Sequence, residues 1–137
     1  MVEKGLLDAS YNWIKLDDCC PLGQKANNGS LQWNPKLFPQ GILWLGEHVN
    51  KKRFRLGIYS DASNLTCGEY PRSLSYEEID ARDFATWGIE YLKLDGCNIS
   101  PKDGQIAEDQ YQEIYRKWHD IFSKFNDPLV LTESAPT

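Results

Sequence analysis

Residues 91–98, with the sequence YLKLDGCN, place a lysine and an aspartate inside a short apolar stretch. In a β-strand successive side chains point to opposite faces, so Tyr91, Lys93 and Asp95 share one face and the two leucines share the other. Gly96 follows at once and marks a turn. The stretch therefore predicts a strand that is apolar on one face and ends in a charged group.

The same pattern recurs along the chain: a short apolar strand, polar residues at its end, a loop and an amphipathic segment. Predicted strands cover residues 12–16, 54–61, 89–96 and 128–134, and predicted helices cover residues 2–9, 41–52, 75–88 and 107–125. Strands that alternate with helices are typical of a parallel sheet whose strands are joined by right-handed crossovers.

The segment 75–88 carries signals for both ends of a helix. Ser75 and Glu78 have the spacing of a capping box, in which each side chain satisfies a backbone N–H in the first turn. Gly88 fits the position just past the last turn, where glycine is favoured. We therefore expect Ser75 to cap this helix and Gly88 to end it.

Polar residues lie at each predicted strand end, at Asp17, Tyr59, Asp95 and Glu133. Carboxyl ends of parallel strands carry the ligand sites of both open α/β sheets and β/α barrels. Two α/β folds fit: a complete four-stranded open sheet, or half of a (β/α)8 TIM barrel, which needs about 250 residues. The 137-residue chain begins in a predicted helix and ends on a strand without a covering helix. We therefore expect residues 1–137 to be a partial barrel of four parallel βα units, truncated at both ends.

Composition excludes several classes of protein. The formal net charge of −5, without a Lys/Arg cluster, argues against nucleic-acid binding. The apolar stretches are too short to span a membrane. With two histidines and no C-x-x-C pair, a zinc site is not expected, and neither is a cofactor.

The cellular compartment is inferred from glycosylation sequons and cysteines. Sequons occur at Asn28, Asn64 and Asn98, and these are candidate glycosylation sites. The first ten residues lack the long apolar core of a signal peptide. Sequons beside cysteines that could form disulfides favour a secreted, extracellular protein, whose signal peptide would not be part of this chain.

The strand-end residues suggest chemistry at a pocket. A lysine beside Asp95 would favour the carboxylate form, which suits a nucleophile or a cation stabiliser, while the alternative is a structural Lys93–Asp95 ion pair. Asp17 and Asp18 could accept hydrogen bonds from a polyhydroxylated ligand. A metal would need more ligands than these two, and N-capping of a helix is the structural alternative. Asp61 adds a further polar group near Tyr59.

The cysteines predict one disulfide. Cys67 and Cys97 follow neighbouring strand ends, so a bridge between them is geometrically natural and would fix the loop after Asp95. Cys19 has no equally convincing partner, because a bridge to the adjacent Cys20 would be strained.

Five collinear segments, LDDCC, NPKLFPQGI, RLGIYSDASNLTCGEYPRS, EIDARDFATWGIEYLKLDGCN and LTESAP, resemble glycoside hydrolase family 27. This family comprises the melibiase-type α-galactosidases and α-N-acetylgalactosaminidases. The similarity covers nearly the whole chain, and the last segment is most similar to the fungal branch. The resemblance implies a (β/α)8 barrel followed by a small β-sandwich domain.

The resemblance also implies residue roles. Asp95 matches the catalytic nucleophile of a retaining double-displacement mechanism. Positions that match substrate-binding residues are Asp17, Asp18, Tyr59, Lys93 and Glu133. In the family the aspartate pair grips hydroxyls around O4 and O6 of galactose, the lysine binds hydroxyls and the tyrosine lines the pocket. Glu133 or its neighbour Ser134 would recognise the 2-hydroxyl.

Other matches concern the cysteines and a sugar attachment site. Cys67 and Cys97 match a family disulfide, and Cys19 matches a cysteine whose partner lies upstream of this chain. Asn64 matches a glycosylated position. Cys20 departs from the family, which usually has tryptophan there, and adds a thiol near the pocket.

The family's acid/base aspartate has no match in this chain, so we expect the chain alone to have little or no α-galactosidase activity. The expected partners are α-galactoside oligosaccharides or glycoconjugates, and the sequence leaves the oligomeric state open. Three alternatives stay open as well: an α-N-acetylgalactosaminidase of the same family, a non-catalytic galactose-binding remnant, and a four-stranded α/β binding module unrelated to sugars.

Overall fold

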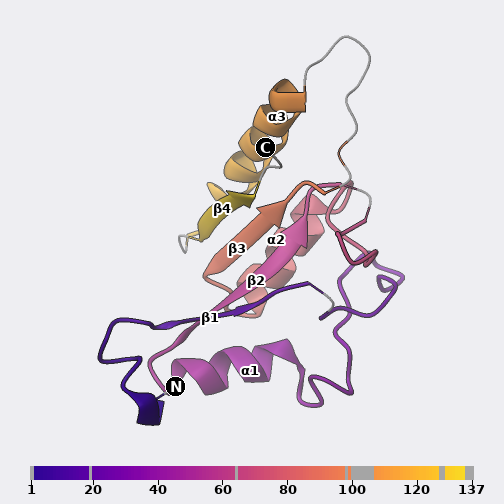
Figure 1. Cartoon of the computed structure of the whole chain (residues 1–137). Helices are drawn as coiled ribbons and strands as arrows, with labels where there is room; N and C mark the ends of the chain where they lie inside the picture. Colours follow the sequence, from indigo (N-terminus) through magenta and orange to yellow (C-terminus); the bar gives the residue numbers. More distant parts are fainter. Residues whose placement is uncertain are drawn as a thin grey trace.

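The computed structural model describes residues 2–18, 20–63, 65–97, 99, 107–126 and 129–134. Four parallel strands form one sheet in the order β1-β2-β3-β4, and the strands are β1 (Trp13–Leu16), β2 (Arg55–Asp61), β3 (Tyr91–Asp95) and β4 (Val130–Ser134). The helices between them are α1 (Gly41–Asn50), α2 (Glu77–Thr86) and α3 (Ala107–Phe122). In Figure 1 the arrows of β2, β3 and β4 point the same way, as the predicted βα alternation requires.

One face of the sheet packs against the helices. Leu92 and Leu94 of β3 are fully buried, and they join a core cluster with Phe84 of α2 and Trp118 of α3. Burying each of these large side chains stabilises the fold by about 1.5–3 kcal/mol. The alternation read from the sequence is thus confirmed, and the opposite face is left to Tyr91, Lys93 and Asp95, which are each half-buried.

On this opposite face a glycine makes room for larger neighbours. A Cβ on Gly57 of β2 would lie 3.0 Å from the Tyr91 Cβ and 3.3 Å from the Lys15 Cγ. Without it, the Lys15 ammonium lies over the Tyr91 ring, 3.6 Å from its centroid. The Tyr91 hydroxyl in turn lies 2.6 Å from the Thr132 hydroxyl of β4, so side chains link the strands across this face.

The strand register sets which residues lie level with Asp95. Asp61 of β2 and Ser134 of β4 are its partners in register, whereas Tyr59 pairs with Lys93, two residues earlier. Glu133 pairs with Leu94. The residues level with Asp95 at the end of the sheet are therefore Asp61 and Ser134. Tyr59 and Glu133, which the sequence suggested for this level, lie earlier in their strands.

The predicted N-terminal helix over residues 2–9 is wrong. Only Val2–Lys4 form a 3-10 turn, η1, and turns follow through residue 10. Gly5 has φ +69° and Ser10 has φ +67°, both incompatible with a right-handed helix. A segment this short gains too few hydrogen bonds to offset the unfavourable first turn of a helix.

The two ends of α2 differ in how well they were predicted. Tyr76, not Ser75, is the N-cap, and no side-chain cap hydrogen bond forms there, because Ser75 has φ +69° while capping needs an extended backbone. Gly88 is confirmed as the residue past the C-cap, with φ +68°. Its N–H donates to the Ala85 carbonyl and the next N–H, of Ile89, donates to the Phe84 carbonyl, which is a Schellman motif.

No helix in the part of the chain that the structure describes is both long enough and apolar enough to cross a membrane.

Candidate active site

The ends of β1, β2 and β3 bring three predicted residues together. The Lys93 Nζ lies 3.3 Å from the Asp17 Oδ2, although the two residues are 76 positions apart. The same ammonium lies 5.0 Å from the centroid of the Tyr59 ring. The parallel sheet thus gathers a cation, an anion and an aromatic ring at one edge, as the strand-end pattern predicted.

The structural alternative of a Lys93–Asp95 ion pair is wrong, because the carboxylate that pairs with Lys93 is Asp17. Alternate residues along one strand are about 6.6 Å apart, which leaves their side chains parallel and separate. The backbone N–H of Asp18 donates to the Asp17 Oδ1, and this bond together with the Lys93 ammonium lowers the pKa of the Asp17 carboxyl. Asp17 therefore stays ionised at the open side of the site.

Asp18 has a different role from its neighbour. Its Oδ2 accepts the backbone N–H of Gly68 at 2.8 Å, which ties the end of β1 to the loop that follows β2. The expected N-capping of a helix by either aspartate is not observed, because residues 20–40 lie between them and α1. One aspartate thus faces the site while the other holds two loops together.

Tyr59 is buried, with 8% of its surface exposed. Its hydroxyl lies 3.5 Å from the Cys67 Sγ and 3.9 Å from the Cys97 Sγ. Burial, reinforced by the negative charges of Asp61 and Asp95, raises the pKa of the Tyr59 phenol. The phenol therefore remains a neutral hydrogen-bond donor at neutral pH.

Asp95 combines a fixed oxygen with an open one. Its Oδ1 accepts the N–H of Gly96 at 2.9 Å, and its backbone carbonyl accepts the N–H of Ala62 at 2.8 Å. Within the described residues no hydrogen bond reaches its Oδ2. A carboxylate held through one oxygen, with the other left without a hydrogen bond by the described residues, is suited to attack an electrophilic carbon.

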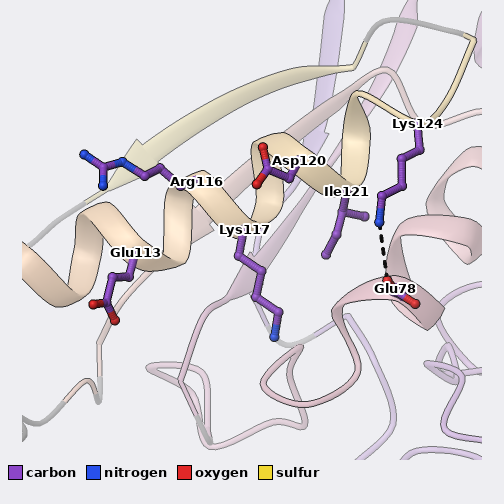
Figure 2. A pocket seen from close by; sticks show the side chains of 7 residues that line it. All are labelled: Glu78, Glu113, Arg116, Lys117, Asp120, Ile121 and Lys124. Carbon is purple, nitrogen blue, oxygen red and sulfur yellow. Dashed lines mark ion pairs between the residues drawn. The ribbon is translucent and has the colours of Figure 1, made fainter.

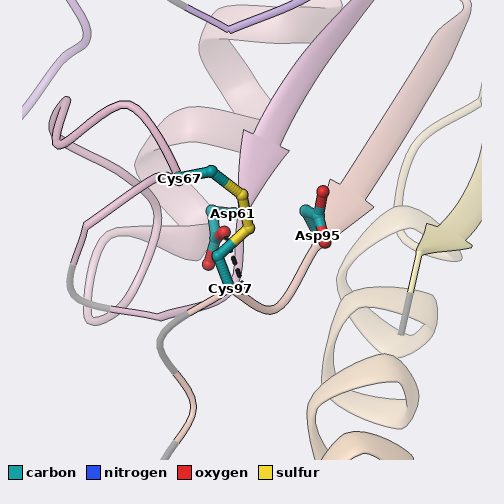
Figure 3. A group of neighbouring side chains, drawn as sticks. All are labelled: Asp61, Cys67, Asp95 and Cys97. Atoms are coloured by element: carbon teal, nitrogen blue, oxygen red, sulfur yellow. Dashed lines mark hydrogen bonds between the residues drawn. A yellow bond between two sulfur atoms is a disulfide. The ribbon is translucent and has the colours of Figure 1, made fainter. Parts of the chain in front are cut away.

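The predicted Cys67–Cys97 disulfide is confirmed, and it lies against Asp61 and Asp95 (Figure 3). One possible ligand atom from each of these four residues lies within 4.8 Å of the others, a spacing that could suggest a metal centre. Metal-binding cysteines are thiolates, however, and these two sulfurs are bonded to each other. The cluster is therefore two carboxylates beside a disulfide.

Asp61 has a larger structural role than the sequence predicted. It is fully buried, and its two oxygens accept the N–H groups of Ser63 at 2.8 Å and Cys97 at 3.1 Å. Its place as the last residue of β2, on the same face as Tyr59, was the signal that could have identified it.

Several predicted residues are not located by the structure. Cys19, Asn64, Asn98 and the side chain of Glu133 lie outside the described part of the chain. Asn28 is exposed, and its Oδ1 accepts the N–H of Ser30 at 3.1 Å. Asn28 is therefore an accessible candidate glycosylation site.

A concave surface lies on the helices. A shallow groove of about 400 Å³ between α2 and α3 is lined mainly by charged side chains, among them Lys124 and Glu78, whose ion pair is 3.6 Å long (Figure 2). None of the strand-end residues lines it. Exposed ion pairs of this kind contribute little energy to the fold.

Comparison with known proteins places the chain in a family. Residues 1–130 match the family model Melibiase_2, described as alpha galactosidase A. Over 136 residues, 99% of the chain, it is 57% identical to the probable alpha-galactosidase A of Aspergillus terreus and 52% identical to the alpha-galactosidase A of Aspergillus niger. It covers 26% and 25% of those proteins, so the chain spans about a quarter of the length of these curated relatives.

A solved structure shows the corresponding fold. The α-galactosidase of Saccharomyces cerevisiae superposes with a TM-score of 0.85 at 33% identity, over 96% of this chain and 28% of the yeast chain. That neighbour is a TIM-barrel glycosidase, so the predicted α/β barrel architecture is confirmed for the four strands present here. On the match of 130 of its residues, the chain belongs to the alpha galactosidase A family, the melibiases of glycoside hydrolase family 27.

Proposed function

We propose that this chain supplies the nucleophile and one side of the galactose pocket of a retaining α-galactosidase. The observation that carries the proposal is Asp95, with one oxygen fixed by Gly96 and the other open, beside the Lys93–Asp17 contact. The names of the relatives, α-galactosidases in fungi, support the same activity. A raffinose complex of the yeast enzyme supports an α-galactoside substrate.

In the proposed reaction the open oxygen of Asp95 attacks the anomeric carbon of a terminal α-D-galactosyl residue. The bond from that carbon to the aglycone oxygen breaks, and a protonated carboxyl about 5–5.5 Å from the nucleophile donates its proton to the leaving oxygen. Water then hydrolyses the galactosyl ester on Asp95, and the anomeric configuration is retained. Family resemblance assigns the acid/base role to an aspartate without a counterpart in these 137 residues.

The other strand-end residues hold the sugar. We assign the Lys93 ammonium and the Asp17 carboxylate to opposite hydrogen-bonding roles, because one only donates and the other, when ionised, only accepts. Tyr59 presents a buried aromatic ring, and the Lys93 ammonium lies over it, 5.0 Å from its centroid. The assignments of Asp18 and Glu133 to hydroxyl recognition stay predictions that substitution can test.

Activity can be tested in the chain itself and in a chimera. In the chimera these residues replace the 136 matching residues of the Aspergillus niger enzyme, which are 52% identical. We expect the chimera to hydrolyse p-nitrophenyl α-D-galactopyranoside, and Asp95→Ala to lower kcat by about 10⁴-fold or more. Asp120→Ala on the exposed face of α3 is the matched control and should leave kcat unchanged. A chimera that folds but does not cleave the substrate would refute the proposal.

The chain on its own should bind galactose weakly and turn over poorly. Loss of the acid/base group lowers the rate by about 10²–10⁴-fold. Calorimetric titration with galactose, compared between the chain and its Asp17→Ala variant, separates a binding module from an inert one. Comparing p-nitrophenyl α-galactoside with the α-N-acetylgalactosaminide in the chimera decides between the two sugar specificities.

We further propose that the protein is a secreted glycoprotein. The exposed Asn28 sequon supports this. Expression in a eukaryotic secretory host should give a protein whose mass falls after treatment with an N-glycosidase. Asn28→Gln should remove one glycan from that mass, while no mass change in either protein would contradict the proposal.

A further inference from the structure

Two carboxylates lie close together at the ends of β2 and β3. Asp61 and Asp95 are partners in register, and a carboxylate oxygen of each lies within 4.8 Å of the other (Figure 3). The two carboxyl groups of a retaining glycosidase are about 5–5.5 Å apart. Distance alone would therefore select Asp61 as the acid/base partner of Asp95 in this chain.

The surroundings of Asp61 rule out that role. Its side chain is fully buried, so it cannot reach a leaving group in the open part of the site. Each of its two oxygens already accepts a backbone N–H, from Ser63 at 2.8 Å and from Cys97 at 3.1 Å. A carboxyl that donates a proton must carry it on one of these oxygens, where it would face an N–H donor.

The same bonds give Asp61 a different task. The turn after β3 is tied to the end of β2 by the bond from the Cys97 N–H to Asp61. It is also tied through the Cys67–Cys97 disulfide and through the bond from the Ala62 N–H to the Asp95 carbonyl. Gly96 lies between these ties, and its N–H holds the Asp95 Oδ1. The position of the turn therefore determines which way the Asp95 carboxylate points.

We infer that Asp61 is a positioning residue: its buried carboxylate fixes the turn at Gly96 and Cys97, and so orients Asp95 for attack. The inference rests on the proposed function of Asp95 as the nucleophile. The disulfide limits how far the turn can move, and the carboxylate sets where within that range it lies. Backbone N–H donors suit this task because they cannot change rotamer.

The kinetic test is made in the chimera with Asp61→Asn. An amide presents one acceptor and one donor, so either the Ser63 N–H or the Cys97 N–H loses its partner. We expect kcat to fall by about 10²-fold, the effect of a nucleophile displaced by about 1 Å, while KM changes less than threefold. Asp120→Asn is the control. An unchanged kcat, or a loss confined to KM, would overturn the inference.

Azide distinguishes a positioning residue from an acid/base residue. In an acid/base variant, azide attacks the anomeric carbon of the galactosyl ester, the Asp95 carboxylate leaves, and α-galactosyl azide forms. Asp61→Ala should show no such product and no gain in rate with an activated aryl galactoside. In Asp95→Gly, azide takes the place of the nucleophile and expels the aglycone, which gives β-galactosyl azide. Formation of α-galactosyl azide by Asp61→Ala would make Asp61 the acid/base group.

A readout without catalysis uses the 137-residue chain itself. Amide hydrogen exchange by NMR should be at least tenfold faster at Cys97 or Ser63 in Asp61→Asn, and unchanged at Ile14 in β1. The melting curve of each variant reports whether it is folded. An inactive wild-type chimera would refute the proposed function alone, and exchange would still test the tether. Unchanged exchange at both amides in a folded variant would overturn the tether and with it the inference.

Discussion

Two regions of the molecule each bury a carboxylate completely, and they compensate its charge in different ways. At the site, Asp61 accepts two backbone N–H groups from its own and the neighbouring turn. On α2, Asp80 pairs with the ammonium of Lys25, whose Nζ lies 2.6 Å away and comes from the loop after β1. Fixed backbone dipoles stabilise the Asp61 carboxylate, and a long, adjustable side chain stabilises the Asp80 carboxylate.

The two interactions differ in how precisely they fix a position and in how far along the chain they act. Burial raises the pKa of the Asp80 carboxyl and lowers the pKa of the Lys25 ammonium. The charged form of each group is therefore less favourable here than in water. In return the pair joins residues 55 positions apart and brings Lys25 to 4.5 Å from the Tyr76 ring centroid. The ion pair anchors a loop, whereas the Asp61 bonds set a geometry. Breaking each region should therefore have different consequences.

The largest effect on stability is expected from breaking the ion pair. Asp80→Ala leaves the Lys25 ammonium buried without its partner, and we expect a loss of about 3–5 kcal/mol in the free energy of unfolding. The double variant Lys25→Met with Asp80→Leu removes both charges at similar volume and should lose much less, because no charge is left unpaired. Urea denaturation of the 137-residue chain measures both. Equal losses in the two variants would mean that the attraction between the two charges, and not the cost of a buried unpaired charge, determines the loss in stability.

The site region should respond nearly as strongly to loss of its disulfide. Cys67→Ala with Cys97→Ala opens a loop of 30 residues, and the entropic model gives a loss of about 3–4 kcal/mol. Unlike the ion-pair variants, this one should also speed amide exchange at Ser63, because the turn that holds Asp61 becomes looser. Urea denaturation of the double variant, and of the wild type with and without a reductant, checks the value, and the reduced wild type should match the variant.

This contrast also explains how far the sequence could predict the molecule. The strands and the face shared by Lys93 and Asp95 followed from the local pattern of apolar residues, and the parallel arrangement followed from the alternation of strands with helices. The disulfide followed because both cysteines stand just after strand ends. What depends on distant packing was missed: nothing in the local pattern couples Lys25 to Asp80.

The errors have the same physical origin. The spacing of Ser75 and Glu78 fits a capping box, but the tertiary path of the chain puts Ser75 at φ +69°. The alternative of a Lys93–Asp95 ion pair failed because Asp95 is close to Lys93 in sequence while the Asp17 carboxylate is close in space. The register that makes Asp61 level with Asp95 is visible only when the strands are paired.

Two glycines allow a smaller, matched comparison of the regions. A Cβ on Gly96, in the site, would lie 2.3 Å from the Cε1 of Tyr111, a buried ring whose hydroxyl donates to the Gly96 carbonyl. A Cβ on Gly29, in the anchored loop, would lie 2.8 Å from the ring of Tyr76, which is 40% exposed. We expect Gly96→Ala to lose about 1–3 kcal/mol by overpacking.

Gly29→Ala adds the strain of φ +88° but meets a ring that can move outward, so its packing loss should be smaller. The variants differ more sharply in catalysis. In the chimera, Gly96→Ala should lower kcat because the shifted turn carries the N–H that holds Asp95, and Gly29→Ala should leave kcat near that of the parent. Thermal melts and kcat measured on the same preparations check both expectations. A kcat loss in Gly29→Ala of the same size would mean that the anchored loop also sets the geometry of the nucleophile.

The smallest effect is a dependence of stability on alkaline pH that reports the burial of the Tyr59 phenol. Because the pKa of the Tyr59 phenol is raised in the folded state, the unfolded chain loses that proton first as pH rises above about 10. Stability is therefore complete below pH 10 and falls above it, by about 1.4 kcal/mol at pH 11. Tyr59→Phe should lack this part of the fall, and the exposed Tyr11→Phe controls for loss of a phenol. Asp61→Asn should keep most of the fall, because burial, the larger cause, still holds the pKa of the folded Tyr59 phenol above its usual value. Urea denaturation at pH 9 and pH 11 measures the difference, and an unchanged difference in Tyr59→Phe would remove Tyr59 from the account of this region.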